Sequence, residues 1–196
     1  NKIKDSSGSA IIGGTGNKLT SSLGSALVST EDGEIFSSSL STIVGGQEGD
    51  INFATQSSII ASDSSDISGS EYGTIVGGRS HDIFHAYIGT IVGGWRNEIV
   101  EIEPRNWTYR GFNTIIGGKE NLIQKPDSIS YGNTVIGGTN NEIITDATAA
   151  DGILNTVIGG DTNIISGGGN NFIAGGMMNQ VQGAGLLNNL GNVILG

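Results

Sequence analysis

Five acidic residues recur at intervals of sixteen along the first half of the chain. They are Glu34, Asp50, Asp66, Asp82 and Glu98. Hard cations such as Ca²⁺ take carboxylate oxygens, so a cation bound between these residues is one interpretation of the series. The other is a solvated edge whose side chains point apart, with repulsion screened over a Debye length of ~8 Å. The sequence leaves both open, and we assign no metal ligand or cofactor from it.

Arginines and aromatic residues gather in a second stretch, between residues 79 and 110. Aromatic rings and guanidinium groups on a rigid scaffold are typical of glycan or receptor binding. The candidate ligand-binding residues are Arg79, Trp95, Arg96, Arg105, Trp107, Tyr109 and Arg110. The alternative is that the segment around Trp107 only packs on the flank of the fold, with that ring as its anchor.

The chemistry-bearing motifs of enzymes are lacking. The sequence has no nucleophile elbow, no P-loop, no H-E-x-x-H motif and no cysteine. His81 and His85 are four residues apart, which suits metal binding on a helix, whereas the local pattern predicts a strand and a connection. Glu101 and Glu103 could imitate the carboxylate pair of a polysaccharide-cleaving enzyme. We expect no enzymatic activity, and a depolymerase is an alternative.

Composition excludes several partner classes. The net charge is −10 with a pI near 4.4, which disfavours nucleic acid and anionic membrane surfaces as partners. The chain has no apolar run near the ~18 residues of a membrane span. We therefore expect neither a nucleic-acid partner nor membrane insertion.

A repeated pentapeptide positions all of these residues. T-I-V-G-G occupies Thr42–Gly46, and close copies begin at residues 74, 90, 114, 134 and 156. The first glycines stand at positions 13, 45, 77, 93, 117, 137, 159, 175 and 196, with degenerate copies centred on Ser29 and Ala61. The base spacing is 16 residues, and self-similarity at a fixed period is the signature of a repeat architecture.

Each repeat contains two short strand signals. One is the β-branched run before the glycines, and the other surrounds an aliphatic residue six positions after the first glycine, such as Leu19 or Val181. Two such strands cannot fold alone, but stacked coils bury a continuous core. The sequence therefore predicts an all-β fold, a parallel β-solenoid of 16-residue, two-strand coils that rise about 4.8 Å each.

We expect one solenoid domain over residues 1–196, with about eleven coils. Insertion loops are predicted at 100–112, 124–132, 144–154 and 182–191, where the spacing exceeds sixteen. Both termini fall inside a repeat, so we expect the chain to be an excerpt of a longer fibre.

Two features of the pentapeptide suggest association between chains. The two residues before the first glycine, such as Ile43 and Val44, are both apolar, although adjacent strand residues point to opposite faces. One of them fills the coil, and the other would form an exposed aliphatic column, which is normally an interface. The glycines are replaced by Ser29, Thr30 and Ala61, among others. Close backbone approach, within the coil or to a neighbouring chain, explains this better than turn geometry alone.

The repeats resemble the head repeats of trimeric autotransporter adhesins and the related repeats of bacteriophage tail fibres. The matching residues include Asn133–Gly138 with Asn141, and Asn155–Gly160 with Asn163. The adhesin repeat is usually shorter and richer in alanine, and it lacks such long insertions. The resemblance implies a side-by-side homotrimer of β-rolls in a fibre on a virion or bacterial cell surface.

Other repeat classes fit less well. The calcium-binding G-G-x-G-x-D repeat requires aspartate at its sixth position, where this chain has Lys18 and Leu122 in two of its copies. A column of threonines, one in most coils, could form an ice-binding face, but alanine, serine and phenylalanine interrupt it.

We therefore expect a structural and adhesive fibre module, such as a phage tail fibre or a bacterial adhesin shaft. Val100–Phe112 is the best candidate for contact with a host-surface glycan or protein receptor. The alternatives are a polysaccharide depolymerase of the tailspike type and a purely structural shaft.

Overall fold

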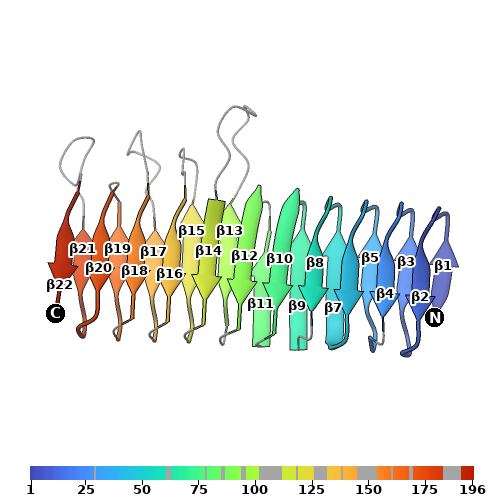
Figure 1. Ribbon diagram of the computed structural model, residues 1–196, viewed down its shortest axis with the longest axis horizontal. Coiled ribbons are helices and arrows are strands. Elements are labelled where there is room, and N and C mark those ends of the chain that lie inside the picture. The colour runs from blue at the N-terminus through green and yellow to red at the C-terminus, as the bar shows by residue number, and fades with distance from the viewer. Residues whose placement is uncertain are drawn as a thin grey trace.

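The computed structural model describes residues 1–28, 30–60, 63–77, 79–84, 87–93, 96–101, 112–117, 119–125, 132–137, 139–144, 154–159, 161–167, 170–182 and 191–196. Within these ranges every regular element is a β-strand, and the strands are stacked side by side along one axis (Figure 1). The predicted all-β parallel solenoid is confirmed. These ranges contain no helix long and apolar enough to cross a membrane.

The odd-numbered strands form the first sheet. They are β1 (Lys2–Lys4), β3 (Lys18–Thr20), β5 (Glu34–Phe36), β7 (Gln47–Asn52), β9 (Asp63–Ser68), β11 (Arg79–Ile83), β13 (Glu98–Glu101), β15 (Leu122–Lys125), β17 (Glu142–Ile144), β19 (Ile164–Ser166) and β21 (Gln180–Gln182).

The even-numbered strands form the second sheet. They are β2 (Ala10–Ile12), β4 (Ala26–Val28), β6 (Thr42–Val44), β8 (Ser58–Ile60), β10 (Tyr72–Val76), β12 (Ile88–Val92), β14 (Phe112–Ile116), β16 (Thr134–Ile136), β18 (Thr156–Ile158), β20 (Phe172–Ala174) and β22 (Val193–Leu195).

Each strand pairs in parallel with its copy one coil away. Ile43 of β6, for example, is aligned with Leu27 of β4 and with Ile59 of β8. Because no coil is offset from the next, every repeat position becomes a column that runs along the solenoid. Residues that recur at the period of the sequence repeat therefore lie next to one another in successive coils.

One aliphatic side chain from nearly every strand fills the interior. The first sheet contributes the series from Leu19 to Val181, and the second contributes the series from Leu27 to Ile173. These side chains are at most 5 % exposed. Burying each stabilises the fold by ~1.5–3 kcal/mol, which makes these two columns the main source of stability.

The turn from an even strand to the following odd strand, here called the glycine corner, begins with the first glycine of each repeat. Gly93, Gly117, Gly137 and Gly159 have φ between +66° and +68°, and a Cβ on any of them would meet nothing within 4 Å. Within one chain, a left-handed conformation rather than close approach selects these four glycines, and close approach to a neighbouring chain stays a prediction.

The second glycine of the repeat behaves differently. At Gly14, φ is +71° and a Cβ would lie 1.8 Å from the Thr30 carbonyl oxygen of the next coil. Close approach does apply there. Thr30 itself, the equivalent residue of that next coil, does not have a positive φ, so its corner has a different backbone conformation.

The turn from an odd strand to the following even strand is here called the insertion edge, because all four predicted insertions lie there. The strands extend one or two residues into the predicted ranges: β13 ends at Glu101, β15 at Lys125, β17 at Ile144 and β21 at Gln182.

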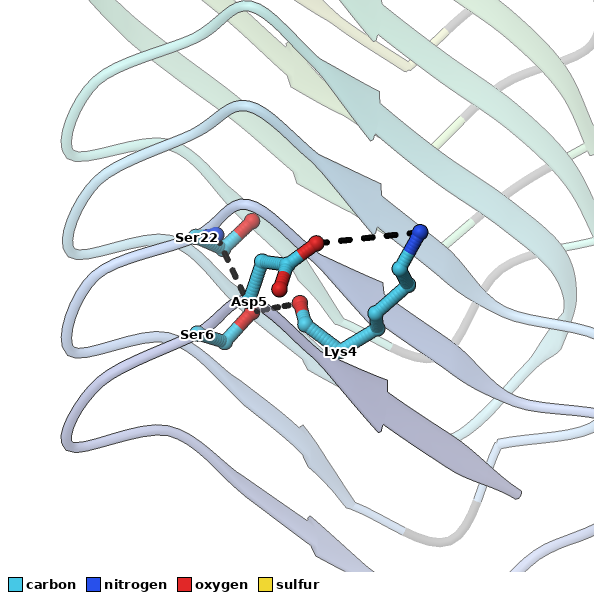
Figure 2. Close-up of polar contacts among 4 residues, drawn as sticks. All are labelled: Lys4, Asp5, Ser6 and Ser22. Atoms are coloured by element: carbon cyan, nitrogen blue, oxygen red, sulfur yellow. Dashed lines mark hydrogen bonds and ion pairs between the residues drawn. The ribbon is translucent and has the colours of Figure 1, made fainter.

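Polar ladders of two kinds stabilise the insertion edge. At the insertion edge the N-terminal coils use serine, and the Ser22 backbone N–H donates to Ser6 Oγ at 3.0 Å while Ser6 Oγ donates to the Lys4 carbonyl (Figure 2). The C-terminal coils use buried asparagine, and the Asn171 backbone N–H donates to Asn155 Oδ1 at 3.1 Å. These bonds satisfy backbone groups that would otherwise be buried without partners.

Candidate functional site

The five acidic residues form one column on the outer face of the first sheet. The pairs Glu34–Asp50, Asp50–Asp66, Asp66–Asp82 and Asp82–Glu98 are all aligned between neighbouring strands, from β5 to β13. The interval of sixteen residues thus places one acidic side chain at the same position in each of five consecutive coils. Parallel strands place such neighbours about 4.8 Å apart, where like charges repel.

The acidic column is half-buried, which alters its titration. Burial raises the pKa of Asp50 to about 6, with further contributions from the charges of Asp66 and Glu34, while a backbone hydrogen bond at Glu34 and the charge of Lys18 act in the opposite direction. Burial, and then the charge of Asp82, raise the pKa of Asp66 and of Glu98. Burial also raises the pKa of Asp82, so Asp50, Asp66, Asp82 and Glu98 take up protons at higher pH than free carboxyl groups do.

The two ends of the acidic column have different neighbouring residues. Lys18 Nζ lies 3.3 Å from Glu34 Oε2 at one end, and Leu122 follows Glu98 at the other. Asp66 Oδ1 is buried without a hydrogen-bond partner. Among the described residues, no group of three or more His, Cys, Asp or Glu side chains is placed to hold a metal ion, and a bound cation stays a prediction.

Two of the predicted ligand-binding residues lie together at the glycine corner. Arg79 begins β11, Arg96 lies two residues before the start of β13, and the Arg96 backbone N–H donates to the Arg79 carbonyl at 3.0 Å. Trp95, Arg105, Trp107, Tyr109 and Arg110 lie outside the described residues, as do His85, Glu103 and the side chain of Glu101.

The structure separates these two arginines from the ends of the predicted recognition segment. That segment leaves the solenoid at Glu101, the end of β13, and returns at Phe112, the start of β14. Both points lie at the insertion edge, at the top of Figure 1, whereas Arg79 and Arg96 lie at the glycine corner below. Strands of four to five residues span about 15 Å between the two edges.

The insertion edge also carries an aromatic row, defined as Tyr72, Tyr87 and Phe112. The ring centroids of Tyr72 and Tyr87 are 5.5 Å apart, and those of Tyr87 and Phe112 are 6.3 Å apart, both edge to face. Tyr72 was not among the predicted site residues. Its signal in the sequence is that Tyr72 and Phe112 both stand five positions before a first glycine.

The second sheet exposes the predicted aliphatic column on its outer face. Its members are Ile12, Val28, Val44, Ile60, Val76, Val92, Ile116, Ile136, Ile158, Ala174 and Leu195. Between β6 and β18 the exposed fractions of Val44, Ile60, Val92, Ile116, Ile136 and Ile158 range from 37 to 42 %. The inward neighbours of these residues are fully buried, so the prediction that one apolar residue of each pair points outward is confirmed.

Comparisons of the chain with protein-family models, with curated proteins and with solved structures find no match.

Proposed function

We propose that this chain is a structural and adhesive fibre module in which three copies associate side by side. The observation that carries the proposal is the aliphatic column, which repeats on one face without a charged residue from Ile12 to Leu195. A contiguous apolar surface of this kind is normally covered by a partner.

A second copy of the chain fits this surface better than an unrelated protein does. Its own column has the same rise of about 4.8 Å per coil, so side chains of two copies can interdigitate at every coil. Covering the exposed part of one valine or isoleucine contributes on the order of 1 kcal/mol, repeated along the solenoid. The resemblance to the repeats of trimeric autotransporter adhesins favours a trimer over a dimer.

The adhesive part of the proposal rests on the insertion edge. In repeat proteins, insertions map to one face, which is often the binding face. The recognition segment, Val100–Phe112, supplies Arg105, Trp107, Tyr109 and Arg110, and a host-surface glycan or protein is the proposed receptor. The setting that suits such a module is extracellular, on a virion or a bacterial cell surface.

Sedimentation equilibrium tests the association. The expected mass is three times the 20.1 kDa of one chain. Ile116→Lys places a charge in the aliphatic column and should dissociate the trimer, whereas Gln124→Lys, on the outer face of the first sheet in the same coil, should not. A monomeric wild-type protein, or an Ile116→Lys variant that stays trimeric, would overturn the proposal.

Retention on arrayed glycans and on host cells tests the adhesive role. Trp107→Ala and Arg110→Ala should reduce retention, while sedimentation should still show a trimer. A trimer that is retained on neither surface would refute adhesion and leave a purely structural shaft.

A further inference from the structure

At both turns of the coil, the residue directly after the strand can adopt a left-handed conformation. At the glycine corner this residue is the first glycine of the repeat, and the Gly93 backbone N–H donates to the Val76 carbonyl of the preceding coil at 2.7 Å. At the insertion edge the Phe53 backbone N–H donates to the Phe36 carbonyl in the same way, at 2.9 Å. The two turns, on opposite edges of the solenoid in Figure 1, therefore place an equivalent residue after the strand.

The insertion edge accepts side chains of different sizes at this position. Four residues there have φ between +47° and +51°, namely Asp5, Ser21, Ser37 and Phe53. Gly69 follows Phe53 in the same column, and its φ is +67°. A positive φ therefore favours glycine in this turn but does not by itself require it, although other residue types adopt it at some cost in stability.

The glycine corner has only small residues at the equivalent position. Every copy of the repeat has glycine there except two, which have Ser29 and Ala61. Crowding within the chain does not explain this restriction, because a Cβ on Gly93, Gly117 or Gly159 would meet nothing within 4 Å. Neither the backbone conformation nor packing within one chain therefore accounts for the exclusion of larger side chains from this corner.

We propose that the aliphatic column of one copy docks against the glycine corner of a neighbouring copy, where small residues let the two chains approach closely. The inference rests on the association proposed above and names the surface that the partner copy covers. Ile116 directly precedes Gly117, and the same order recurs at each first glycine of the second sheet. The exposed aliphatic column and the corner glycines therefore lie beside one another along the solenoid and form one continuous surface.

A second copy of the chain matches this surface coil by coil. Its aliphatic column and the glycines of its neighbour share the rise of about 4.8 Å per coil, so one apolar side chain can lie over each glycine. A larger side chain at the corner would stand between the two chains and separate them. The contact joins two different surfaces and is therefore heterologous, and heterologous contacts can close a ring of three chains.

Asparagine at the glycine corner tests the contact. This residue tolerates a positive φ, as Asn140 with its φ of +45° shows, and the free space within the chain accommodates its side chain. Gly93→Asn, Gly117→Asn and Gly159→Asn, combined in one protein, should abolish the trimer in sedimentation equilibrium at concentrations where the wild-type protein is trimeric. Gly93→Asn alone should raise the dissociation constant about tenfold.

Gly69→Asn is the matched control. Gly69 has a φ of +67°, against +66° for Gly93, and it follows its strand at the insertion edge rather than at the glycine corner. Gly69→Asn should therefore leave the dissociation constant of the trimer unchanged. In the Ile116→Lys variant, which is expected to be monomeric, Gly93→Asn should shift the midpoint of urea unfolding no more than Gly69→Asn does, because no neighbour covers the corner there.

The outcomes separate this inference from the proposed function. A wild-type trimer that survives the combined substitution overturns the glycine corner as the docking surface and leaves the proposed trimer standing. Equal weakening by Gly69→Asn and Gly93→Asn overturns it in the same way, because a general effect of asparagine would then explain the loss. If the combined variant does not fold, an unchanged dissociation constant for Gly93→Asn alone is the refuting result. A wild-type protein that sediments as a monomer contradicts the association itself.

Discussion

Replacing one carboxylate of the acidic column should stabilise the protein at neutral pH. We choose Asp66→Asn, because Asp66 lies at the centre of the column between Asp50 and Asp82. Asparagine keeps the shape of the side chain and removes its charge. The change relieves repulsion with both neighbours and ends the cost of keeping a half-buried carboxylate ionised.

The sign and size of the effect follow from the titration of Asp50. Burial, with the charges of Asp66 and Glu34, raises its pKa from 3.8 to about 6, so the folded protein binds this proton more tightly than the unfolded chain does. The resulting stabilisation is fully present below pH 3.8 and is lost as the pH rises through about 6. Fully expressed, such a shift corresponds to roughly 3 kcal/mol, and solvent screening of this half-buried group reduces it to ~1 kcal/mol.

Urea unfolding at pH 7.5 and at pH 5 measures how the substitution and the pH each change the free energy of unfolding. The wild-type protein should gain stability on acidification. At pH 7.5 the free energy of unfolding of Asp66→Asn should exceed that of wild type by on the order of 1 kcal/mol. On acidification to pH 5 the variant should gain less stability than wild type does. Glu142→Gln is the control, because Glu142 occupies the same column between Leu122 and Ile164 and has no carboxylate beside it.

Two results would refute this reasoning. One is an Asp66→Asn variant that is no more stable than wild type at pH 7.5. The other is a wild-type protein that loses stability between pH 7.5 and pH 5, because the carboxylates would then be stabilised in their charged form, as bound cations would achieve.

Three further predictions concern the fold, and urea unfolding measures each of them. Ile91→Ala should cost about 2–5 kcal/mol because it empties a fully buried position. Val92→Ala on the outer face, made in the Ile116→Lys variant that is expected to be monomeric, should cost less than about 1 kcal/mol. Asn155→Ala removes the acceptor of two Asn171 donors and should cost about 1–3 kcal/mol. Gly137→Ala should cost about 1–2 kcal/mol through its φ of +68° alone, because space is free around it; no loss would contradict the assignment of a left-handed turn.

The repeat made the fold predictable from the sequence. An aliphatic residue at the same place in successive coils, such as Ile35 and Ile51, can be buried only if the coils stack in register. The alternation of adjacent strand residues then assigned Ile43 to the interior and Val44 to the surface, as the structure shows.

For the first glycine of each repeat, the prediction of close approach within the coil failed because it assumed one backbone conformation for every corner. Thr30 occupies the same repeat position as Gly14 and Gly46, and these two glycines have a positive φ whereas Thr30 does not. Corners of equal length thus adopt different backbone conformations. The residue types that occur at a corner position do not by themselves reveal which conformation each corner has.

The site was less predictable than the fold. Stacking of the acidic residues follows from their spacing, but their burial depends on side chains from neighbouring coils that no single repeat contains. The aromatic row combines two different repeat positions, that of Tyr87 and that shared by Tyr72 and Phe112. A segment of variable length also separates Phe112 from the preceding coil, so sequence spacing alone did not bring these rings together.

The geometry of the coil explains why binding and association can use different parts of one module. The first glycine and the buried aliphatic residue of the next strand are always six residues apart, as from Gly13 to Leu19, so the glycine corner has a constant length. Variation in length is confined to the insertion edge, where Phe112 and Tyr72 begin their strands. The aliphatic column lies instead on the outer face of the second sheet. Three chains that cover this column would still leave their insertion edges accessible, so each coil can contribute to the shaft and to a ligand at the same time.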